Sequence, residues 1–193
     1  MKVVGLTGGI AMGKSTAANM IRMLGVPVHD SDSAVHELYK QGGGGARALS
    51  AIFPEAVAND AVNRTKLREL VIGKTEALKT LESIVHPLVH QHSKNWLHKQ
   101  KLRNASLAVL DIPLLFETGR DQECDEVWVV NCPPFLQRQR ALGRPGIDSD
   151  KLEAILERQV PQEFRLRQAD RIFQTGNGRA ALLKNLKLAL SKV

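Results

Sequence analysis

Cysteine, aromatic residues and long apolar runs are all scarce in this sequence of 193 residues. The two cysteines, Cys124 and Cys132, lack the Cys/His spacing of a zinc site, and a secreted protein of this size has little use for a lone pair. No stretch approaches the roughly 20 apolar residues that cross a bilayer. The opening MKVVGLTGGI is too short and too rich in glycine for a signal peptide. We therefore expect a soluble, cytoplasmic protein with two reduced thiols and no membrane partner.

Aromatic residues make up only 4% of the chain, so side chains on which nucleic-acid bases could stack are few. Lys and Arg outnumber Asp and Glu by 27 to 20, which gives a formal net charge of +7. A basic balance suits either nucleic acid or an anionic small molecule. The scarcity of aromatic residues favours a small anionic substrate, such as a nucleotide, and no nucleic-acid partner.

Short apolar runs alternate with helical patterns along the chain, which is typical of a parallel sheet covered by helices. Buried strands are indicated at Lys2–Thr7, Leu107–Ile112 and Val127–Val130. Apolar residues at helical spacing occur over Lys14–Leu24 and Lys151–Gln168. The pattern predicts an α/β fold with a parallel sheet flanked by helices.

The spacing of these elements predicts one domain over residues 1–193 with two elaborations. Residues of about 33–103 are mostly helical in pattern, which is too long for a simple crossover and indicates an inserted helical region. Residues of about 135–160 are charged and helical and contain a Gly/Pro-rich break, which indicates a mobile lid.

The phosphate-binding pattern G-x-x-x-x-G-K-[ST] is complete at residues 8–15, after an apolar strand and before an amphipathic helix. The N–H groups of such a loop point at phosphates, which also lie at the positive end of the following helix. We expect Lys14 to reach the β- and γ-phosphates of ATP, and the Ser15 hydroxyl to ligate Mg²⁺. Because both pattern and context are present, we prefer nucleotide binding to a glycine-rich turn that binds nothing. The residues expected around the nucleotide are Gly8, Gly9, Ala11, Met12, Gly13, Lys14, Ser15 and Thr16.

The class of phosphate-loop protein depends on what else the chain carries. An Asn-Lys-x-Asp run for guanine recognition is absent from the sequence, which disfavours a GTPase. Nucleic-acid motors need a longer chain. The size fits a small kinase.

Acidic residues follow two of the expected strands. Asp111 ends one of them and could hold Mg²⁺ or its water beside the loop, or serve as a turn residue. Asp30 and Asp32 are two apart in an extended segment and share a face, so one of them could accept the proton of an attacking hydroxyl. The other interpretation of Asp32 is a cap for a helix that begins at Ser33, and the two roles are compatible.

Arginines crowd the segment after residue 135, where Arg140 and Arg144 are four residues apart. Phosphoryl transfer spreads negative charge over the transferred oxygens, and a closing lid with arginines neutralises that charge. A solvated basic helix face is the alternative. Gly143 and Pro145 make Arg144 a loop-edge residue, which favours the lid.

His86 and His90 are at i,i+4 spacing, which invites a metal site. Pro87 occupies the place where a hydrolytic zinc motif needs glutamate. We therefore prefer a helix start at His86-Pro87.

Together these features resemble the dephospho-CoA kinase family over nearly the whole chain. The phosphate loop and Pro113-Leu-Leu-Phe-Glu117 are the most distinctive motifs, and the order and spacing of the weaker ones add to them. The resemblance is carried by Gly5–Ile10 with Gly13–Thr16, Asp30-Ser31-Asp32, Arg64 with Leu67, His86-Pro87-Leu88, Pro113–Glu117, Gln137 with Arg140 and Arg144, Gln159, and Ala169-Asp170.

The resemblance implies a P-loop kinase with a helical substrate-binding region and a lid. It implies ATP-dependent phosphorylation of the 3′-hydroxyl of dephospho-CoA, giving coenzyme A and ADP in the last step of coenzyme A synthesis. Asp32 would be the general base, and Arg140 and Arg144 would neutralise charge in the transition state beside Lys14. The residues implied to bind the substrate are Asp32, Arg64, His86, Leu115 and Glu117, and those implied to hold the metal are Ser15 and Asp111.

The chain departs from the family pattern at three places. Ala11-Met12 replace the usual Gly-Ser in the loop, and Pro145 follows the lid arginine where Asp or Asn is usual. Thr175 and the neighbouring Gln174 replace the usual Asn near the end of the chain. Two other functions remain open: another small-molecule or nucleoside monophosphate kinase, and a non-catalytic ATP-binding protein.

Overall fold

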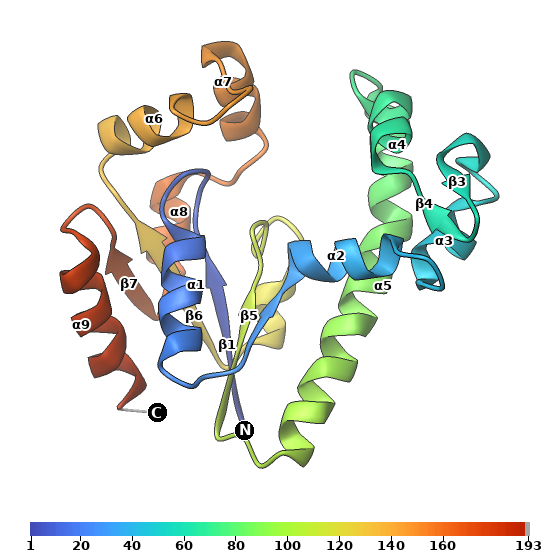
Figure 1. The fold of residues 1–193 in the computed structure, drawn as a ribbon. Coiled ribbons are helices and arrows are strands. Elements are labelled where there is room, and N and C mark those ends of the chain that lie inside the picture. Colours follow the sequence, from blue (N-terminus) through green and yellow to red (C-terminus); the bar gives the residue numbers. More distant parts are fainter. Residues whose placement is uncertain (192–193) are drawn as a thin grey trace. The chain divides into compact units, whose positions relative to one another are not determined.

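In the computed structural model, which describes residues 1–191, the chain forms two compact units (Figure 1). The first unit comprises Met1–His29 with Gln100–Val193, and the second comprises Asp30–Lys99. The elements follow one another as β1 (Lys2–Thr7), α1 (Lys14–Met23), β2 (Val28–Asp30), α2 (Ser31–Tyr39), α3 (Gly44–Leu49), η1 (Pro54–Ala56), β3 (Val57–Ala58), β4 (Ala61–Val62), α4 (Arg64–Val71), α5 (Thr75–Leu102), β5 (Leu107–Asp111), η2 (Arg120–Glu123), β6 (Glu126–Asn131), α6 (Pro134–Leu142), α7 (Ser149–Glu157), α8 (Gln162–Arg167), β7 (Arg171–Gln174) and α9 (Arg179–Leu190).

The main sheet has five strands in the order β2-β5-β1-β6-β7. β1 pairs in parallel with β5 and with β6, and β6 pairs in parallel with β7. Every residue of β5 is buried, as are the last four of β1, which is why both strands are continuous apolar runs in the sequence. The parallel arrangement brings the carboxyl ends of these strands to one edge of the sheet, and the predicted α/β fold is confirmed.

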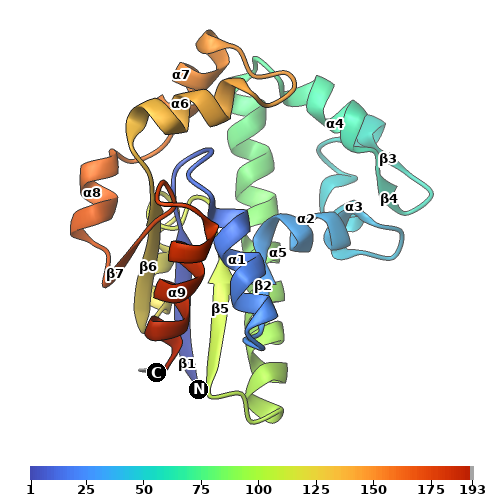
Figure 2. The ribbon, with the colours of Figure 1, turned by 60° about the vertical axis from the view of Figure 1, so that its left-hand side comes forward.

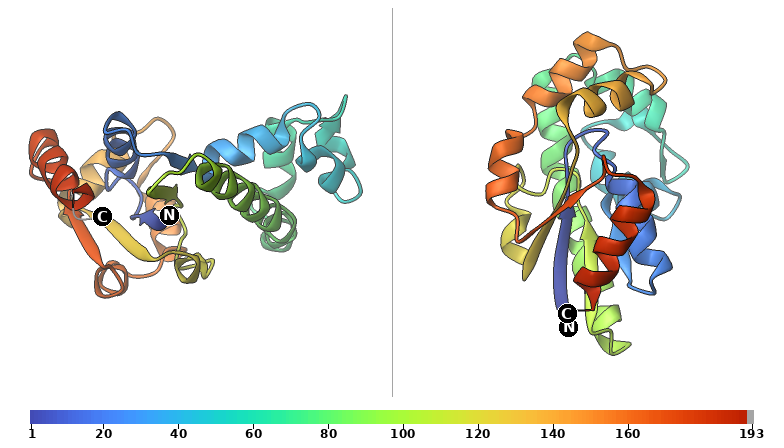
Figure 3. Two further views of the ribbon diagram at one scale, coloured as in Figure 1. Left: turned by 90° about the horizontal axis from the view of Figure 1, so that it is seen from below. Right: turned by 90° about the vertical axis from the view of Figure 1, so that its left-hand side faces the viewer.

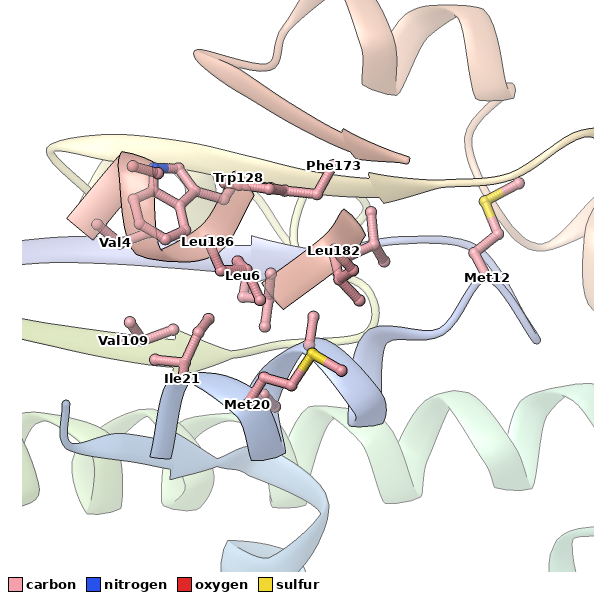
Figure 4. Close-up of a cluster of buried hydrophobic side chains, with 14 of the residues drawn as sticks. Val4, Leu6, Met12, Met20, Ile21, Val109, Trp128, Phe173, Leu182 and Leu186 are labelled. Carbon is pink, nitrogen blue, oxygen red and sulfur yellow. The ribbon is translucent and has the colours of Figure 1, made fainter. Parts of the chain in front are cut away.

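α1 and α9 pack against each other on one face of this sheet (Figures 2 and 3). The core between them and the strands contains Trp128 and Leu6, both fully buried, with Ile21 from α1 and Leu186 from α9 (Figure 4). Trp128 also contacts Phe173 of β7, with ring centroids 5.1 Å apart. This core fixes β1 and α1, the two elements that carry the loop between them.

The second unit has a separate apolar core, formed by helices and a two-stranded antiparallel sheet of β3 and β4. Val85 and Val89 of α5 are both buried in it. The helix start predicted at His86-Pro87 is wrong, because α5 runs through Pro87 from Thr75 to Leu102. A proline inside a helix costs about 3 kcal/mol, and burying each valine returns roughly 1.5–3 kcal/mol, so packing keeps the helix continuous.

A second helix boundary also differs from the prediction. The helix predicted over Lys151–Gln168 is two helices, α7 and α8, separated by residues 158–161. Pro161 lacks an N–H and disfavours helical backbone in the residue before it, so the break is local chemistry. No helix within residues 1–191 is long and apolar enough to cross a membrane.

Candidate functional site

The loop between β1 and α1 has a backbone that only certain residues tolerate. Gly13 has a φ of 90°, in the left-handed region that favours glycine. A Cβ on Gly8 would lie 2.4 Å from Cγ2 of Val130 and 2.9 Å from its backbone oxygen, so no larger residue fits there. Two fixed glycines of the phosphate-binding pattern therefore have direct structural reasons.

Lys14 and Asp111 form a buried ion pair at this end of the sheet. Nζ of Lys14 donates a hydrogen bond to Oδ1 of Asp111 over 2.5 Å, and their side chains are only 15% and 4% exposed. Lys14 begins α1, which follows β1, and Asp111 ends β5, the strand that pairs with β1. The ion pair therefore joins the start of α1 to the end of the neighbouring strand. Ser15 follows Lys14 on the exposed side of the helix start. The sequence predicted that Asp111 stands beside the loop, and the structure adds a direct bond to the lysine.

Ile10, near the tip of the loop, is bonded on both sides by glutamine side chains. Its N–H donates to Oε1 of Gln159 at 3.2 Å, and its C=O accepts from Nε2 of Gln137 at 3.0 Å. Gln137 lies on α6 and Gln159 follows α7, so both belong to the segment predicted as a lid (Figure 2). A Cβ on the adjacent Gly9 would lie 2.9 Å from Nη2 of Arg165 and 3.1 Å from Gln137. The tip of the loop is therefore enclosed by side chains that come from beyond residue 134.

The two departures in the loop, Ala11 and Met12, are both buried. Ala11 has a φ of 59°, a conformation that costs a residue with a Cβ roughly 1–2 kcal/mol. Its methyl group packs in a small apolar cluster with Ala141 of α6 and Leu152 of α7. Met12 is 1% exposed and extends the main core (Figure 4). Apolar packing thus holds the loop where the family pattern has Gly-Ser.

Arg140 contacts Thr175, the third departure, rather than solvent alone. Its Nη1 donates to Oγ1 of Thr175 at 3.1 Å, and its Nη2 donates to the backbone oxygen of Thr175 at 3.0 Å. The Thr175 hydroxyl in turn donates to the backbone oxygen of Met12 at 2.7 Å. Arg140 is therefore connected to the phosphate loop through one buried threonine. Arg144 lies in the exposed turn between α6 and α7.

The Pro113–Glu117 motif lies between the sheet and the segment that leads from α7 to α8. Oε1 of Glu117 accepts from the N–H of Val160 at 2.8 Å, and Nη1 of Arg165 donates to the Val160 C=O at 2.7 Å. Burial lowers the pKa of the Arg165 guanidinium, and the charge of Glu117 opposes that shift. The rings of Phe116 and Phe164 meet edge to face. These contacts fix both the motif and the end of the segment that the sequence predicts as a lid.

Gly5 of β1 leaves the space that Leu115 and Cys124 fill. A Cβ on Gly5 would lie 2.8 Å from Sγ of Cys124 and 3.1 Å from a methyl group of Leu115. Leu115 is fully buried, so in this structure it packs against the sheet. Burial raises the pKa of the Cys124 thiol to about 12.

Asp30 and Asp32 have different local environments at the start of α2. The helix begins at Ser31, and the carboxylate of Asp30 accepts from the N–H of Ser33 at 3.0 Å. The alternative role of Asp32, as the cap of a helix that begins at Ser33, is wrong, because Asp30 is the N-cap, two residues earlier. Asp32 lies exposed in the first turn, where its negative charge interacts favourably with the positive end of the helix dipole.

Two further residues expected at the substrate belong to the same second unit. Arg64 begins α4 after the Asn63 cap, and its Nη1 lies 3.4 Å from Nδ1 of His36 on α2. His86 is exposed in the interior of α5. The first unit brings Lys14, Asp111 and the loop together, whereas Asp32, Arg64 and His86 are positioned by the second.

Sequence reasoning did not assign Gln137, Gln159, Arg165 or Thr175 to the site. Gln137 and Gln159 stand out only as matches to the resembled family, and Thr175 only as a departure from it. The bonds that connect three of these residues to the loop span more than 120 residues: Gln137 and Gln159 bond Ile10, and Thr175 bonds Met12. No local periodicity carries that information.

The chain is similar in sequence and in fold to several known proteins. Residues 2–180 match the family model described as dephospho-CoA kinase. A dephospho-CoA kinase from Mesorhizobium japonicum is 51% identical over 178 residues, covering 92% of this chain and 89% of the relative. A crystal structure from Thermus thermophilus superposes with a TM-score of 0.80 at 31% identity, covering 100% of this chain and 97% of that one. A dephospho-CoA kinase from Campylobacter jejuni shares the fold, with a TM-score of 0.70 at 24% identity over 99% of this chain and 96% of that one.

Proposed function

The chain belongs to the dephospho-CoA kinase family, and from this premise we propose how its residues divide the work. It uses ATP to phosphorylate dephospho-CoA in the synthesis of coenzyme A. We propose that the acceptor is the 3′-hydroxyl and that the products are coenzyme A and ADP. In this reaction the acceptor oxygen forms a bond to the γ-phosphorus, the bond from that phosphorus to the β–γ bridging oxygen breaks, and ADP leaves.

The observation that carries the proposal is the buried pair of Lys14 and Asp111 beside a complete phosphate loop. A lysine held at the positive end of α1 is placed to meet phosphate oxygens, whose charge exceeds that of one carboxylate. When the phosphates of ATP bind, Lys14 exchanges Asp111 for them, and the carboxylate, no longer bonded to Lys14, can bind a cation or its water. The charge of the buried site is thus balanced both without and with the nucleotide.

Mg²⁺ fits the donors that the loop offers. The Ser15 hydroxyl and the Asp111 carboxylate are hard oxygen ligands, and few enough to leave positions for phosphate oxygens and water. When bound, the ion neutralises charge on the β- and γ-phosphates. We propose that Ser15 and Asp111 hold it directly or through water.

Proton transfer belongs to Asp32 in this proposal. Its carboxylate is exposed and Asp30 takes the cap, so the structural duty at the helix start falls on Asp30. Asp32 accepts the proton of the acceptor hydroxyl as the oxygen attacks. The phosphoryl oxygens gain stabilisation from Lys14 and from the lid residue Arg144. Arg140, which is hydrogen-bonded to Thr175, contributes a third positive charge.

Dephospho-CoA is proposed to contact Arg64, His86 and Glu117. Arg64 and His86 are exposed on the second unit and offer a cation and an imidazole to an anionic ligand. Oε1 of Glu117 accepts from the N–H of Val160, and we propose that the other carboxylate oxygen accepts a hydrogen bond from the ligand. Leu115 is fully buried and contributes by holding the Pro113–Glu117 motif. We also propose that the enzyme acts in the cytoplasm, where its two free cysteines stay reduced.

The direct test is to incubate the protein with Mg-ATP and dephospho-CoA and to follow ADP and coenzyme A by chromatography. Equal amounts of the two products are expected. Parallel reactions with shikimate and with nucleoside monophosphates provide the specificity control. Binding of ATP without turnover of any acceptor would indicate a non-catalytic protein, and preferential turnover of another acceptor would indicate a different small kinase.

A further inference from the structure

Two carbonyl groups of the phosphate loop are held by side chains from distant elements. The C=O of Ile10 accepts from Nε2 of Gln137 at 3.0 Å, and the C=O of Met12 accepts from Oγ1 of Thr175 at 2.7 Å. Gln137 lies on α6 and Thr175 directly follows β7, so the two donors reach the loop independently. Both donor residues are 7% exposed, so water competes little with these bonds.

A bond to a peptide carbonyl also sets the direction of the N–H in the same peptide. The described residues 1–191 contain no cis peptide bond, and in a planar trans peptide the C=O and the N–H point to opposite sides. The peptide of Ile10 O carries the N–H of Ala11, and the peptide of Met12 O carries the N–H of Gly13. Gln137 and Thr175 therefore direct these two N–H groups away from themselves.

The directed N–H groups are available to a ligand. Among the hydrogen bonds found within residues 1–191, none uses the N–H of Ala11 or of Gly13 as donor. By contrast, the N–H of Ile10 is taken by Gln159 and that of Met12 by the Gly9 carbonyl. Along the loop, the N–H groups of Ile10 and Met12 are therefore bonded within the protein, whereas those of Ala11 and Gly13 can bind an anion.

The loop needs such external restraint because its own backbone is permissive. Gly13 has no Cβ to limit rotation of the peptide before it, and Ala11 is held in the left-handed region at a φ of 59°. Arg140 donates to the hydroxyl oxygen of Thr175 at 3.1 Å, so the single hydroxyl hydrogen goes to a carbonyl. The Met12 carbonyl at 2.7 Å is the nearer acceptor, and the Asn131 carbonyl lies at 3.3 Å. The NH₂ group of Gln137 is the end of its amide that can donate to a carbonyl, so this end faces Ile10.

We propose that Gln137 and Thr175 are positioning residues, which aim the N–H groups of Ala11 and Gly13 at the phosphates of ATP by holding the carbonyl on the other side of each peptide. The inference rests on the proposed binding of ATP phosphates in this loop and adds residues to which no role was given there. It also gives Arg140 a second task, because Arg140 orients Thr175.

The first experiment follows the loop amides by NMR while the wild-type protein is titrated with Mg-ADP. The amide protons of Ala11 and Gly13 should shift on binding. In Thr175→Val the Gly13 shift should shrink while the Ala11 shift persists, and in Gln137→Met the reverse should hold. This reciprocal pattern reports on single peptides, which a general loss of structure would not produce.

The second experiment is kinetic and uses matched controls. Thr175→Val and Gln137→Met should each lower kcat/KM for ATP by on the order of 10- to 100-fold. Complete loss of one donor to a developing charge lowers the rate by about 10²–10³-fold, and a misdirected donor should cost somewhat less. Thr175→Ser should restore most of the activity because it keeps the hydroxyl. Thr80→Val is the matched control, because the Thr80 hydroxyl also donates to a backbone carbonyl, at 2.9 Å, but lies on an exposed helix face. This substitution should leave kcat/KM for ATP unchanged.

A negative charge introduced beside the carbonyl sharpens the test. Gln137→Glu places a carboxylate against the Ile10 carbonyl and should be at least as defective as Gln137→Met. Gln139→Glu adds the same charge to the exposed face of the same helix and is the control for repulsion of ATP. If one variant fails to fold, as judged by its melting curve, the other site still carries the test because the donors belong to different elements.

The outcomes separate this inference from the function itself. If the wild type shows amide shifts at Ala11 and Gly13 and the variants keep both shifts and normal kcat/KM for ATP, the positioning role is wrong while the nucleotide site stands. If the wild type binds Mg-ADP without any shift in this loop, the proposed nucleotide site is wrong and the positioning role with it.

Discussion

Replacing Lys14 by methionine should lower stability as well as activity, because Lys14 neutralises a carboxylate that is almost wholly buried. The Asp111 side chain is 4% exposed and its partner nitrogen lies 2.5 Å away. Removing one member of a buried pair costs about 3–5 kcal/mol, since the other charge stays buried without that partner. Lys14 is 15% exposed, so water reaches the site slightly and the lower end of that range applies.

A loss of about 3 kcal/mol corresponds to a fall of roughly 6–12 °C in Tm for a chain of this size. The double variant Lys14→Met/Asp111→Asn removes both charges and should regain most of that loss while remaining inactive. The assay is thermal and urea unfolding of the wild type, both single variants and the double variant, with kcat measured on the same samples.

An exposed pair of similar length provides the control. Lys40 and Glu37 lie 2.6 Å apart, but their side chains are 52% and 56% exposed. Exposed pairs contribute little to stability because water screens them, so Lys40→Met should leave Tm almost unchanged. The reasoning is refuted if Lys14→Met melts with the wild type, or if the double variant is as unstable as Lys14→Met.

Three further predictions concern separate residues. Asp32→Asn should lower kcat about 10²-fold with ATP affinity retained, whereas Asp30→Ala should mainly cost about 1 kcal/mol of stability as a lost cap; a more severe kcat defect in Asp30→Asn than in Asp32→Asn would reverse the assignment. Arg144→Ala should lower kcat on the order of 10²-fold at an unchanged Tm, because the residue is exposed; an effect on dephospho-CoA affinity alone would remove it from the lid role. Burial raises the pKa of Glu126, but hydrogen bonds from Lys2, Trp128 and Arg171 outweigh this and lower it to about 2. Because that pKa is depressed on folding, its stabilisation is present above the unfolded value of about 4.3 and is lost as pH falls toward 2. Urea titrations from pH 6 to pH 2 should therefore show a steeper acid loss in the wild type than in Glu126→Gln, and equal slopes would contradict the assignment.

The sequence predicts the sheet well because the strands next to β1 are buried on both faces. The apolar run Leu107–Ile112 is almost the observed β5, and Asp111 is identified by its place at the end of that run. The phosphate loop is equally legible, since Gly8 and Gly13 are required by local sterics and backbone conformation. Features set by short-range geometry leave short-range patterns.

The second layer around the loop is not legible in the same way. Gln137, Gln159 and Thr175 act through single hydrogen bonds to backbone atoms, and any exposed helix or strand end carries such residues. Pro87 misled the helix prediction because its local cost is visible in the sequence, whereas the burial of Val85 and Val89 that offsets it depends on a core assembled from distant segments.

The packing of Cys124 against Gly5 affects how readily its thiol reacts with alkylating agents and peroxides. Only thiolates react readily with alkylating agents and peroxides, and at pH 7 a thiol with a pKa of about 12 is ionised in roughly one molecule in 10⁵. Burial raises the pKa of the Cys132 thiol as well, so neither native sulfur is an efficient target. Treatment with iodoacetamide at neutral pH should leave both thiols intact until urea unfolds the chain. A single cysteine introduced on an exposed surface could then carry a fluorophore without removal of the native pair.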